Sequence, residues 1–170
     1  MQVYLLRHAI AEPRDPEHYP VDADRPLTGT GARRMARAAR GLRSLGLRFD
    51  LVLTSPLVRA RQTARIVVPL FRPRPPQRAL RPLSPGGGAG GVFAALSEVP
   101  ADAAVLLVGH EPDLGRLAAA MLLDPRADLP IEFKKGGICR IDFEGAPRPG
   151  GGRLVFHLAP RILRRLGGSA

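Results

Sequence analysis

Several residue types that mark particular protein classes are scarce in this sequence of 170 residues. The single cysteine, Cys139, cannot form an internal disulfide and has no partner for a cysteine-based zinc site. No apolar run approaches the roughly 20 residues needed to span a bilayer. The apolar start of the chain meets a charge at Arg7, which does not fit the long apolar stretch of a secretory signal. We therefore expect a cytoplasmic protein without a membrane anchor.

Aromatic residues are also scarce, since tryptophan is absent and aromatics make up 5% of the chain. This matters because a formal net charge of +11 would otherwise suggest nucleic acid as a partner. Few aromatic side chains are available to stack on bases. Lysine occurs only at Lys134 and Lys135, so the charge reflects an arginine bias in a chain rich in Gly, Pro and Ala. We expect a positive field that favours anionic substrates or acidic protein partners, and no dedicated nucleic-acid function.

The length and a hydrophobic content of 45% predict a single domain over residues 1–170 with one core. Five stretches have the apolar patterns of strands, at 3–6, 50–54, 104–108, 137–143 and 153–158. The first three are compact runs typical of buried parallel strands, and the last two predict an antiparallel edge. Apolar spacing also predicts helices, over 30–45, 92–98 and 113–123.

Proline and glycine interrupt the chain between these elements. Four prolines among charges in Ala11–Pro26 predict a surface loop. The proline- and glycine-rich stretch Arg72–Gly91 predicts a long loop that contains a short strand or helix. Ser55 and the proline after it predict another helix start, with Ser55 as its cap and Arg59 in its first turn. Thr28 is expected to be a cap or turn residue.

Three short segments place reactive side chains at the ends of predicted strands or the starts of predicted helices. They are Arg7-His8-Ala9, the stretch Ser55–Ala64, and Val108-Gly109-His110-Glu111-Pro112. An α/β fold gathers groups around an anion at such positions. Two imidazoles and two guanidiniums in these segments therefore indicate a site for phosphoryl transfer through a histidine nucleophile.

We interpret His8 as the nucleophile, because a neutral imidazole can attack phosphorus when its other ring nitrogen is held as a donor. Arg7 and Arg59 would neutralise the phosphoryl oxygens through their planar guanidiniums. His110 would add a hydrogen-bond donor or a positive charge. Each residue alone also has an ordinary interpretation, His8 as a structural histidine and Arg59 as one of several solvated arginines on its helix.

In this order, the segments resemble the histidine phosphatase superfamily, also called the phosphoglycerate mutase-like family, for which Ser55–Ala64 is a specific signature. Asp24–Thr28 leading into Gly31, and later Gly109-His110, are similar to the pattern of its small SixA-type phosphohistidine phosphatases. The resemblance extends over most of the chain and implies a three-layer α/β/α sandwich with a mostly parallel central sheet. It implies no metal and no organic cofactor. The implied phosphate pocket consists of Arg7, His8, Arg59 and His110, with His8 phosphorylated during turnover.

Two features depart from the family's pattern. Ala9 stands where the family commonly has glycine, a change that costs little if the backbone there does not need glycine. Mutases and many phosphomonoesterases of the family carry an acidic proton donor after the second arginine, but residues 72–97 contain no carboxylate. Alkoxide leaving groups need such an acid, because they are about as basic as hydroxide, whose conjugate acid, water, has a pKa of about 15.7. An imidazole leaving group, with a conjugate-acid pKa of about 6.5, does not.

We therefore expect a phosphohistidine phosphatase that removes phosphate from a protein such as a phosphorelay domain. A broader phosphomonoesterase acting on small phosphorylated metabolites is the alternative, and a nonenzymatic anion-binding module is a third hypothesis. Glu12, Asp24 and Glu111 are the candidate proton donors if the chain uses an acid. Glu111 also suits a helix N-terminus, where its charge would complement the dipole.

Overall fold

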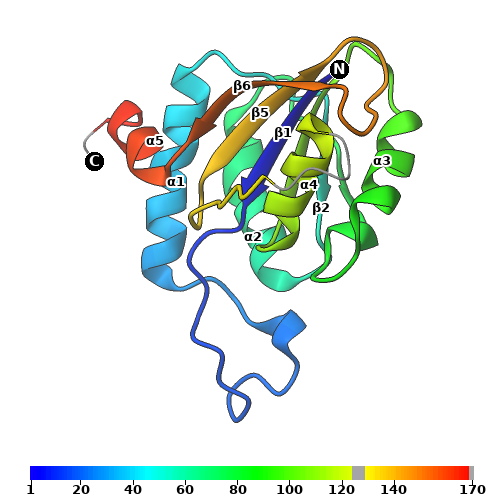
Figure 1. The fold of residues 1–170 in the computed structure, drawn as a ribbon. Coiled ribbons are helices and arrows are strands. Elements are labelled where there is room, and N and C mark those ends of the chain that lie inside the picture. The colour runs from blue at the N-terminus through cyan, green and yellow to red at the C-terminus, as the bar shows by residue number, and fades with distance from the viewer. Residues whose placement is uncertain (124–128, 169–170) are drawn as a thin grey trace.

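The computed structural model describes residues 1–123 and 129–168, and within them a six-stranded sheet forms the centre of the molecule (Figure 1). The strands are β1 (Gln2–Arg7), β2 (Leu51–Thr54), β3 (Gln77–Ala79), β4 (Ala104–Gly109), β5 (Ile138–Phe143) and β6 (Gly152–Leu158). They lie in the order β3-β2-β4-β1-β5-β6. Neighbours from β3 to β1 are parallel, and β5 and β6 are antiparallel. The predicted, mostly parallel sheet with an antiparallel edge is confirmed.

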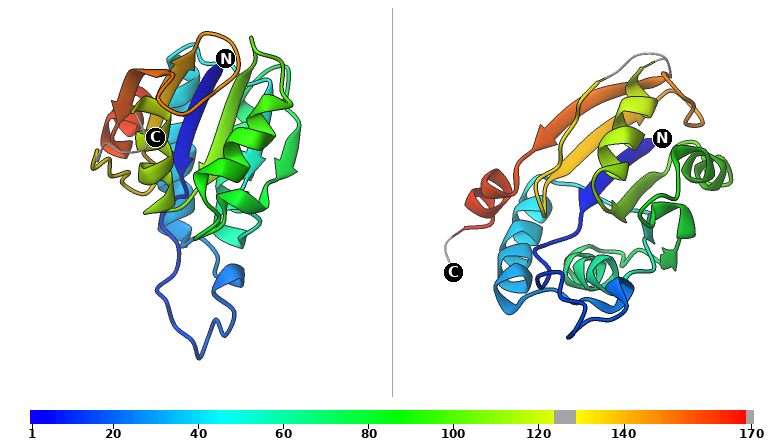
Figure 2. Two further views of the ribbon diagram at one scale, coloured as in Figure 1. Left: turned by 45° about the vertical axis from the view of Figure 1, so that its right-hand side comes forward. Right: turned by 60° about the horizontal axis from the view of Figure 1, so that its bottom comes forward.

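Helices cover both faces of the sheet and form the three expected layers (Figure 2). One face carries α1 (Gly29–Ser44), α2 (Val58–Val67) and α5 (Pro160–Leu166), and the other carries α3 (Ala89–Ser97) and α4 (Asp113–Leu122). Successive residues of a strand point to opposite faces of a sheet. In β1, Tyr4 and Leu6 therefore enter the first core, while Val3 and Leu5 enter the second.

The caps of α1 and α2 differ in how far they agree with the sequence predictions. Thr28 caps α1, because its hydroxyl accepts the Gly31 N–H at 2.8 Å. Ser55 does not cap α2, and this prediction was wrong. The chain stays extended through Leu57, the N-cap residue, and the helix begins only at Val58. Ser55 thus lies outside the first turn of the helix.

Two other helices differ from the predictions. α3 begins at Ala89, so the end of the glycine-rich stretch expected to be loop is helical. α5 was not predicted, because it is short and Leu163 is its only buried residue. The short strand β3 confirms the regular element expected within the loop after Arg72. No helix in the two described segments of the chain has the length and apolar character needed to cross a membrane.

Candidate active site

The carboxyl ends of three neighbouring parallel strands carry the side chains of the candidate site. His8 follows β1, His110 follows β4 and Ser55 follows β2. The His8 N–H donates to the carbonyl of Gly109 at 3.1 Å, and the Ser55 N–H donates to the carbonyl of Val108 at 2.9 Å. These bonds hold three segments that are distant in sequence at one edge of the sheet, where α/β folds bind their ligands.

His8 is a buried ring with a defined tautomer. It is 6% exposed, and its Nδ1 lies 2.7 Å from the carbonyl oxygen of Ala9. A carbonyl can only accept, so Nδ1 carries the proton and Nε2 keeps its lone pair. Burial, together with the charges of Arg59 and Arg7, lowers the pKa of His8 to about 3 despite its hydrogen bond to Ala9. Near neutral pH, His8 is therefore uncharged and can act as a nucleophile through Nε2.

His110 lies beside His8, with 4.9 Å between the ring centroids. Its Nε2 is 2.8 Å from the hydroxyl oxygen of Ser55. That hydroxyl accepts the Leu57 N–H at 3.3 Å, so its own proton is available for Nε2 of His110. In the tautomer in which the hydroxyl donates to Nε2, the ring proton of His110 lies on Nδ1. Burial and the neighbouring His8 and Arg59 lower the pKa of His110 to about 3, which makes the ring a neutral hydrogen-bond donor.

Two guanidiniums complete the cluster. Arg7 donates from Nη1 to the carbonyl of Phe133. Arg59, in the first turn of α2, donates from Nη1 to the Asp22 carbonyl at 2.8 Å and from Nη2 to the Asp22 carboxylate at 2.9 Å. The Nε groups of both arginines and Nδ1 of His110 are buried and have no hydrogen-bond partner in the described part of the chain. Because unpaired buried donors are rare and costly, these three donors indicate a site for an anion.

Asp22 is a residue of this site that the sequence analysis missed. It belongs to the short 3-10 turn Asp22–Asp24, in the loop that projects from the lower end of the molecule in Figure 1. Its carboxylate accepts hydrogen bonds from Arg25 and Arg59, both at 2.9 Å. Burial raises the pKa of Asp22, but the hydrogen bonds and charges of these two arginines outweigh that effect and lower it. Asp22 is therefore ionised and positions Arg59.

The three candidate proton donors lie in different surroundings. Glu111 accepts the Phe133 N–H at 2.7 Å. Asp24 is exposed and Glu12 half-buried, and neither side chain forms a hydrogen bond within residues 1–123 and 129–168. No carboxylate in these segments is among the groups that shift the pKa of His8, whereas the charge of Asp22 acts on the pKa of His110. Nor do three His, Cys, Asp or Glu side chains of the described residues gather as a metal site would require.

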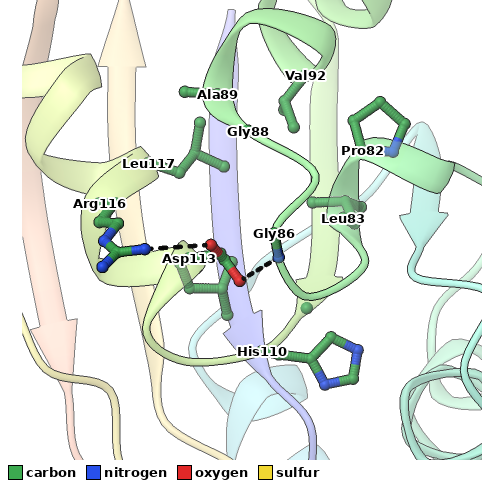
Figure 3. A pocket seen from close by; sticks show the side chains of 12 residues that line it. Pro82, Leu83, Gly86, Gly88, Ala89, Val92, His110, Asp113, Arg116 and Leu117 are labelled. Carbon is green, nitrogen blue, oxygen red and sulfur yellow. Dashed lines mark hydrogen bonds and ion pairs between the residues drawn. The ribbon is translucent and has the colours of Figure 1, made fainter. Parts of the chain in front are cut away.

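A cavity of about 200 Å³ opens beside His110 (Figure 3). Its walls are largely apolar and come from the 3-10 turn Arg81–Leu83, α3 and α4. Asp113 lies on its polar side, where the carboxylate accepts the Gly86 N–H at 3.0 Å and lies 3.8 Å from the guanidinium of Arg116. The cavity offers space for an apolar or aromatic group next to the anion site.

Comparisons with known proteins agree with this arrangement. Residues 3–79 match the model of the histidine phosphatase superfamily (branch 1). An uncharacterized protein of Picosynechococcus sp. is 40% identical over 92% of this chain and 90% of its own length. The phosphohistidine phosphatase SixA of Escherichia coli is 28% identical over 96% of this chain and 97% of its own length. The structure of the protein histidine phosphatase SixA complexed with tungstate matches with a TM-score of 0.82 and 28% identity, over 96% of this chain and 99% of that chain.

The matches cover both the motifs and the architecture. The family model spans α1 and α2 and includes Arg7, His8 and Arg59. The similarity to SixA in sequence and in fold extends over almost the whole chain. Catalysis without a metal fits this family. The resemblance inferred from the motifs is thereby confirmed, and the chain belongs to the histidine phosphatase superfamily and is a phosphatase.

Proposed function

We propose that this phosphatase removes phosphate from phosphohistidine on a protein, and that His8 is phosphorylated during turnover. One observation carries the proposal. The neutral His8 ring, with its lone pair on Nε2, lies beside buried donors of Arg7, Arg59 and His110 that have no acceptor within the described residues. The ring can attack phosphorus while the donors hold the phosphoryl oxygens. The similarity to SixA, which is named a phosphohistidine phosphatase, supports this substrate class.

In the first step, Nε2 of His8 forms a bond to phosphorus while the bond from phosphorus to the substrate's imidazole nitrogen breaks. The electron pair of the broken bond stays on the substrate ring, which carries a proton on its other nitrogen and therefore leaves as neutral imidazole. The donors of Arg7, Arg59 and His110 stabilise the charge on the phosphoryl oxygens. In the second step, water attacks phosphorus and the bond to His8 breaks, which releases inorganic phosphate and restores the neutral ring.

The carboxylates around the site favour a leaving group that needs no acid. Asp22 is held ionised by two arginines, and Glu111 is bound to the backbone N–H of Phe133. Because Asp22 stays ionised, it is a poor proton donor. Imidazole, with a conjugate-acid pKa of about 6.5, leaves without one. The largely apolar cavity beside His110 has room for such a ring.

Phosphate release from a short phosphohistidine peptide tests the role of His8. We expect His8→Ala to lower kcat by more than about a thousandfold, because the variant has no atom that can accept the phosphoryl group. Acid-sensitive, base-stable label on the wild-type protein after rapid quenching would identify the covalent intermediate, and His8→Asn should carry none. Turnover of the peptide by His8→Ala at the wild-type rate would contradict the mechanism.

A panel of leaving groups separates this activity from that of a broader phosphomonoesterase acting on small metabolites. We expect kcat/KM to fall steeply from phosphohistidine and p-nitrophenyl phosphate to aliphatic phosphate esters. Asp22→Asn should lower all these rates by a similar factor, because Asp22 positions Arg59 and supplies no proton. Efficient hydrolysis of aliphatic esters that is lost selectively in Asp22→Asn would instead identify a proton donor and favour the alternative.

A further inference from the structure

Four arginines surround one hollow on the outer side of α2. The hollow has a volume of about 400 Å³, and we refer to it as the arginine groove. The described residues that line it include no carboxylate and no aromatic side chain. The lining residues that matter here are Arg61 and Arg65 of α2, Arg74, Arg78 of β3, and the strand ends Thr54 and Ala79.

The charges of the arginine groove are not compensated locally. All four arginines are exposed, and none forms an ion pair or a side-chain hydrogen bond within the described segments. Arg25, Arg59 and Arg140, by contrast, each pair with a carboxylate. Exposed arginines elsewhere, such as Arg161 and Arg165, also form no ion pair within the described segments, so the distinguishing feature of the groove is that four such arginines line one hollow. Four like charges around one hollow repel one another. An anionic partner in the groove would relieve this repulsion.

The groove opens at the same edge of the sheet as the candidate active site. Thr54 and Ala79 are the last residues of β2 and β3, and they are aligned in the parallel register of these strands. The residue after Thr54 is Ser55, whose hydroxyl contacts His110. α2 joins the two regions, because it carries the buried Arg59 as well as two arginines of the groove.

We propose that the arginine groove binds an acidic surface of the phosphorylated protein while its phosphohistidine occupies the site at His8. The inference rests on the proposed function and names the kind of partner that the enzyme takes. The buried Arg59 and the exposed arginines of the groove lie on different sides of α2, so a ligand that contacts both regions must be extended. A protein surface fits the groove better than a single-stranded nucleic acid, which binds largely through stacking on aromatic side chains.

Two phosphohistidine peptides of equal length test the groove, one with four glutamates beside the modified residue and one with four glutamines. We expect the wild-type enzyme to prefer the glutamate peptide through a lower KM, and this preference to weaken as salt is added. Replacing Arg61 and Arg65 together by glutamine should raise the KM for the glutamate peptide about fivefold and leave kcat unchanged. Hydrolysis of free phosphohistidine should not change.

The matched control is the double variant Arg161→Gln and Arg165→Gln. These two arginines have the same spacing on α5 and are also exposed, but α5 follows the opposite edge strand of the sheet. The control should keep the wild-type preference. An unchanged preference in Arg61→Gln with Arg65→Gln would overturn the proposal, as would tighter binding of a single-stranded oligonucleotide in the groove than of the glutamate peptide.

Binding of the unphosphorylated glutamate peptide, followed by fluorescence anisotropy, distinguishes a failure of the groove from a failure of the proposed function. If no phosphohistidine compound is hydrolysed, the proposed function fails. Weaker binding of the glutamate peptide to Arg61→Gln with Arg65→Gln, and not to the α5 control, would still support the groove as a site for acidic proteins. Equal binding by all three proteins would overturn the groove whatever the outcome of the activity assay.

Discussion

His8 and His110 are buried, and burial lowers the pKa of each ring to about 3. The positive charge of the site is carried by Arg7 and Arg59, since arginine stays protonated at any pH that proteins tolerate. In the proposed reaction, the two residue types thus have separate tasks. Neutral imidazoles supply a lone pair and an N–H donor, and the guanidiniums supply charge that does not titrate. A protonated His8 would lose the lone pair that the proposed reaction needs.

Ser55 is the residue whose replacement tests this division of tasks most directly. Its hydroxyl contacts Nε2 of His110 at 2.8 Å, and Ser55 itself is fully buried. We expect Ser55→Ala to lower kcat by about tenfold to a hundredfold with little change in KM, because the tautomer of His110 is no longer fixed. Steady-state kinetics with a phosphohistidine peptide would measure the effect.

Two further measurements distinguish a role in the tautomer from a general loss of structure. In the nitrogen NMR spectrum of ¹⁵N-histidine-labelled protein, the protonated nitrogen of His110 should be Nδ1 in the wild type and a mixture of both ring nitrogens in Ser55→Ala. The matched control is Ser97→Ala, which removes an exposed hydroxyl bonded to its own helix at Ala94. A Ser55→Ala enzyme with wild-type kcat would mean that the hydroxyl has no part in positioning His110.

At the scale of secondary structure, the sequence predicted the strand ends well because buried parallel strands are compact apolar runs. Each such run stops where a polar residue begins, which placed His8 and His110 correctly after β1 and β4. Parallel strands share one carboxyl edge, so the spatial grouping of these residues followed from strand type. The first turn of α2 placed Arg59 in the same region.

Contacts that depend on tertiary packing could not be predicted from local sequence. Ser55 has the signature of a helix cap, and its contact with His110 exists only because β2 and β4 are neighbours. Asp22 is one of several carboxylates in a proline-rich loop, and nothing local indicates that it turns toward Arg59. α5 is too short for a periodic pattern. Its position depends on its contact with α1.

That contact provides a prediction at the scale of packed helices. Gly41 of α1 lies so close to α5 that a Cβ at this position would overlap the carbonyl of Leu163. We expect Gly41→Ala to lower the free energy of unfolding by about 1–3 kcal/mol, because the backbone of α5 has to move. Gly90→Ala in α3 is the control, since a Cβ there would meet no atom within 4 Å.

Urea unfolding would measure both variants. Gly90→Ala should be neutral or should stabilise the protein by up to about 1 kcal/mol, because alanine favours helix more than glycine does. If Gly41→Ala were as stable as Gly90→Ala, this result would contradict the close approach of α1 and α5. The site residues lie on other elements, so activity below the unfolding transition should change little in either variant.

At the scale of the whole molecule, the groups proposed to bind phosphate reduce the stability of the fold. Buried donors without partners, on Arg7, Arg59 and His110, each lose hydrogen bonds to water that the unfolded chain keeps. The net charge of +11 adds repulsion that a compact chain experiences more strongly than an unfolded one. The proposed binding of a phosphoryl group or an acidic partner would offset both effects, and stability and function would then be linked through charge.

The linkage has a defined sign for the two buried histidines. An unfolded histidine has a pKa of about 6.5, whereas burial lowers the pKa of His8 and His110 to about 3. Protonation therefore favours the unfolded chain, so the stability that depends on the neutral rings is complete above pH 6.5 and is lost as the pH falls toward 3. We expect the free energy of unfolding, from urea titrations, to fall by about 2 kcal/mol between pH 6 and pH 5. In the double variant His8→Asn with His110→Asn, the free energy of unfolding should depend clearly less on pH over this range. A wild-type curve no steeper than that of the variant would mean that both rings titrate in the fold as they do in the unfolded chain.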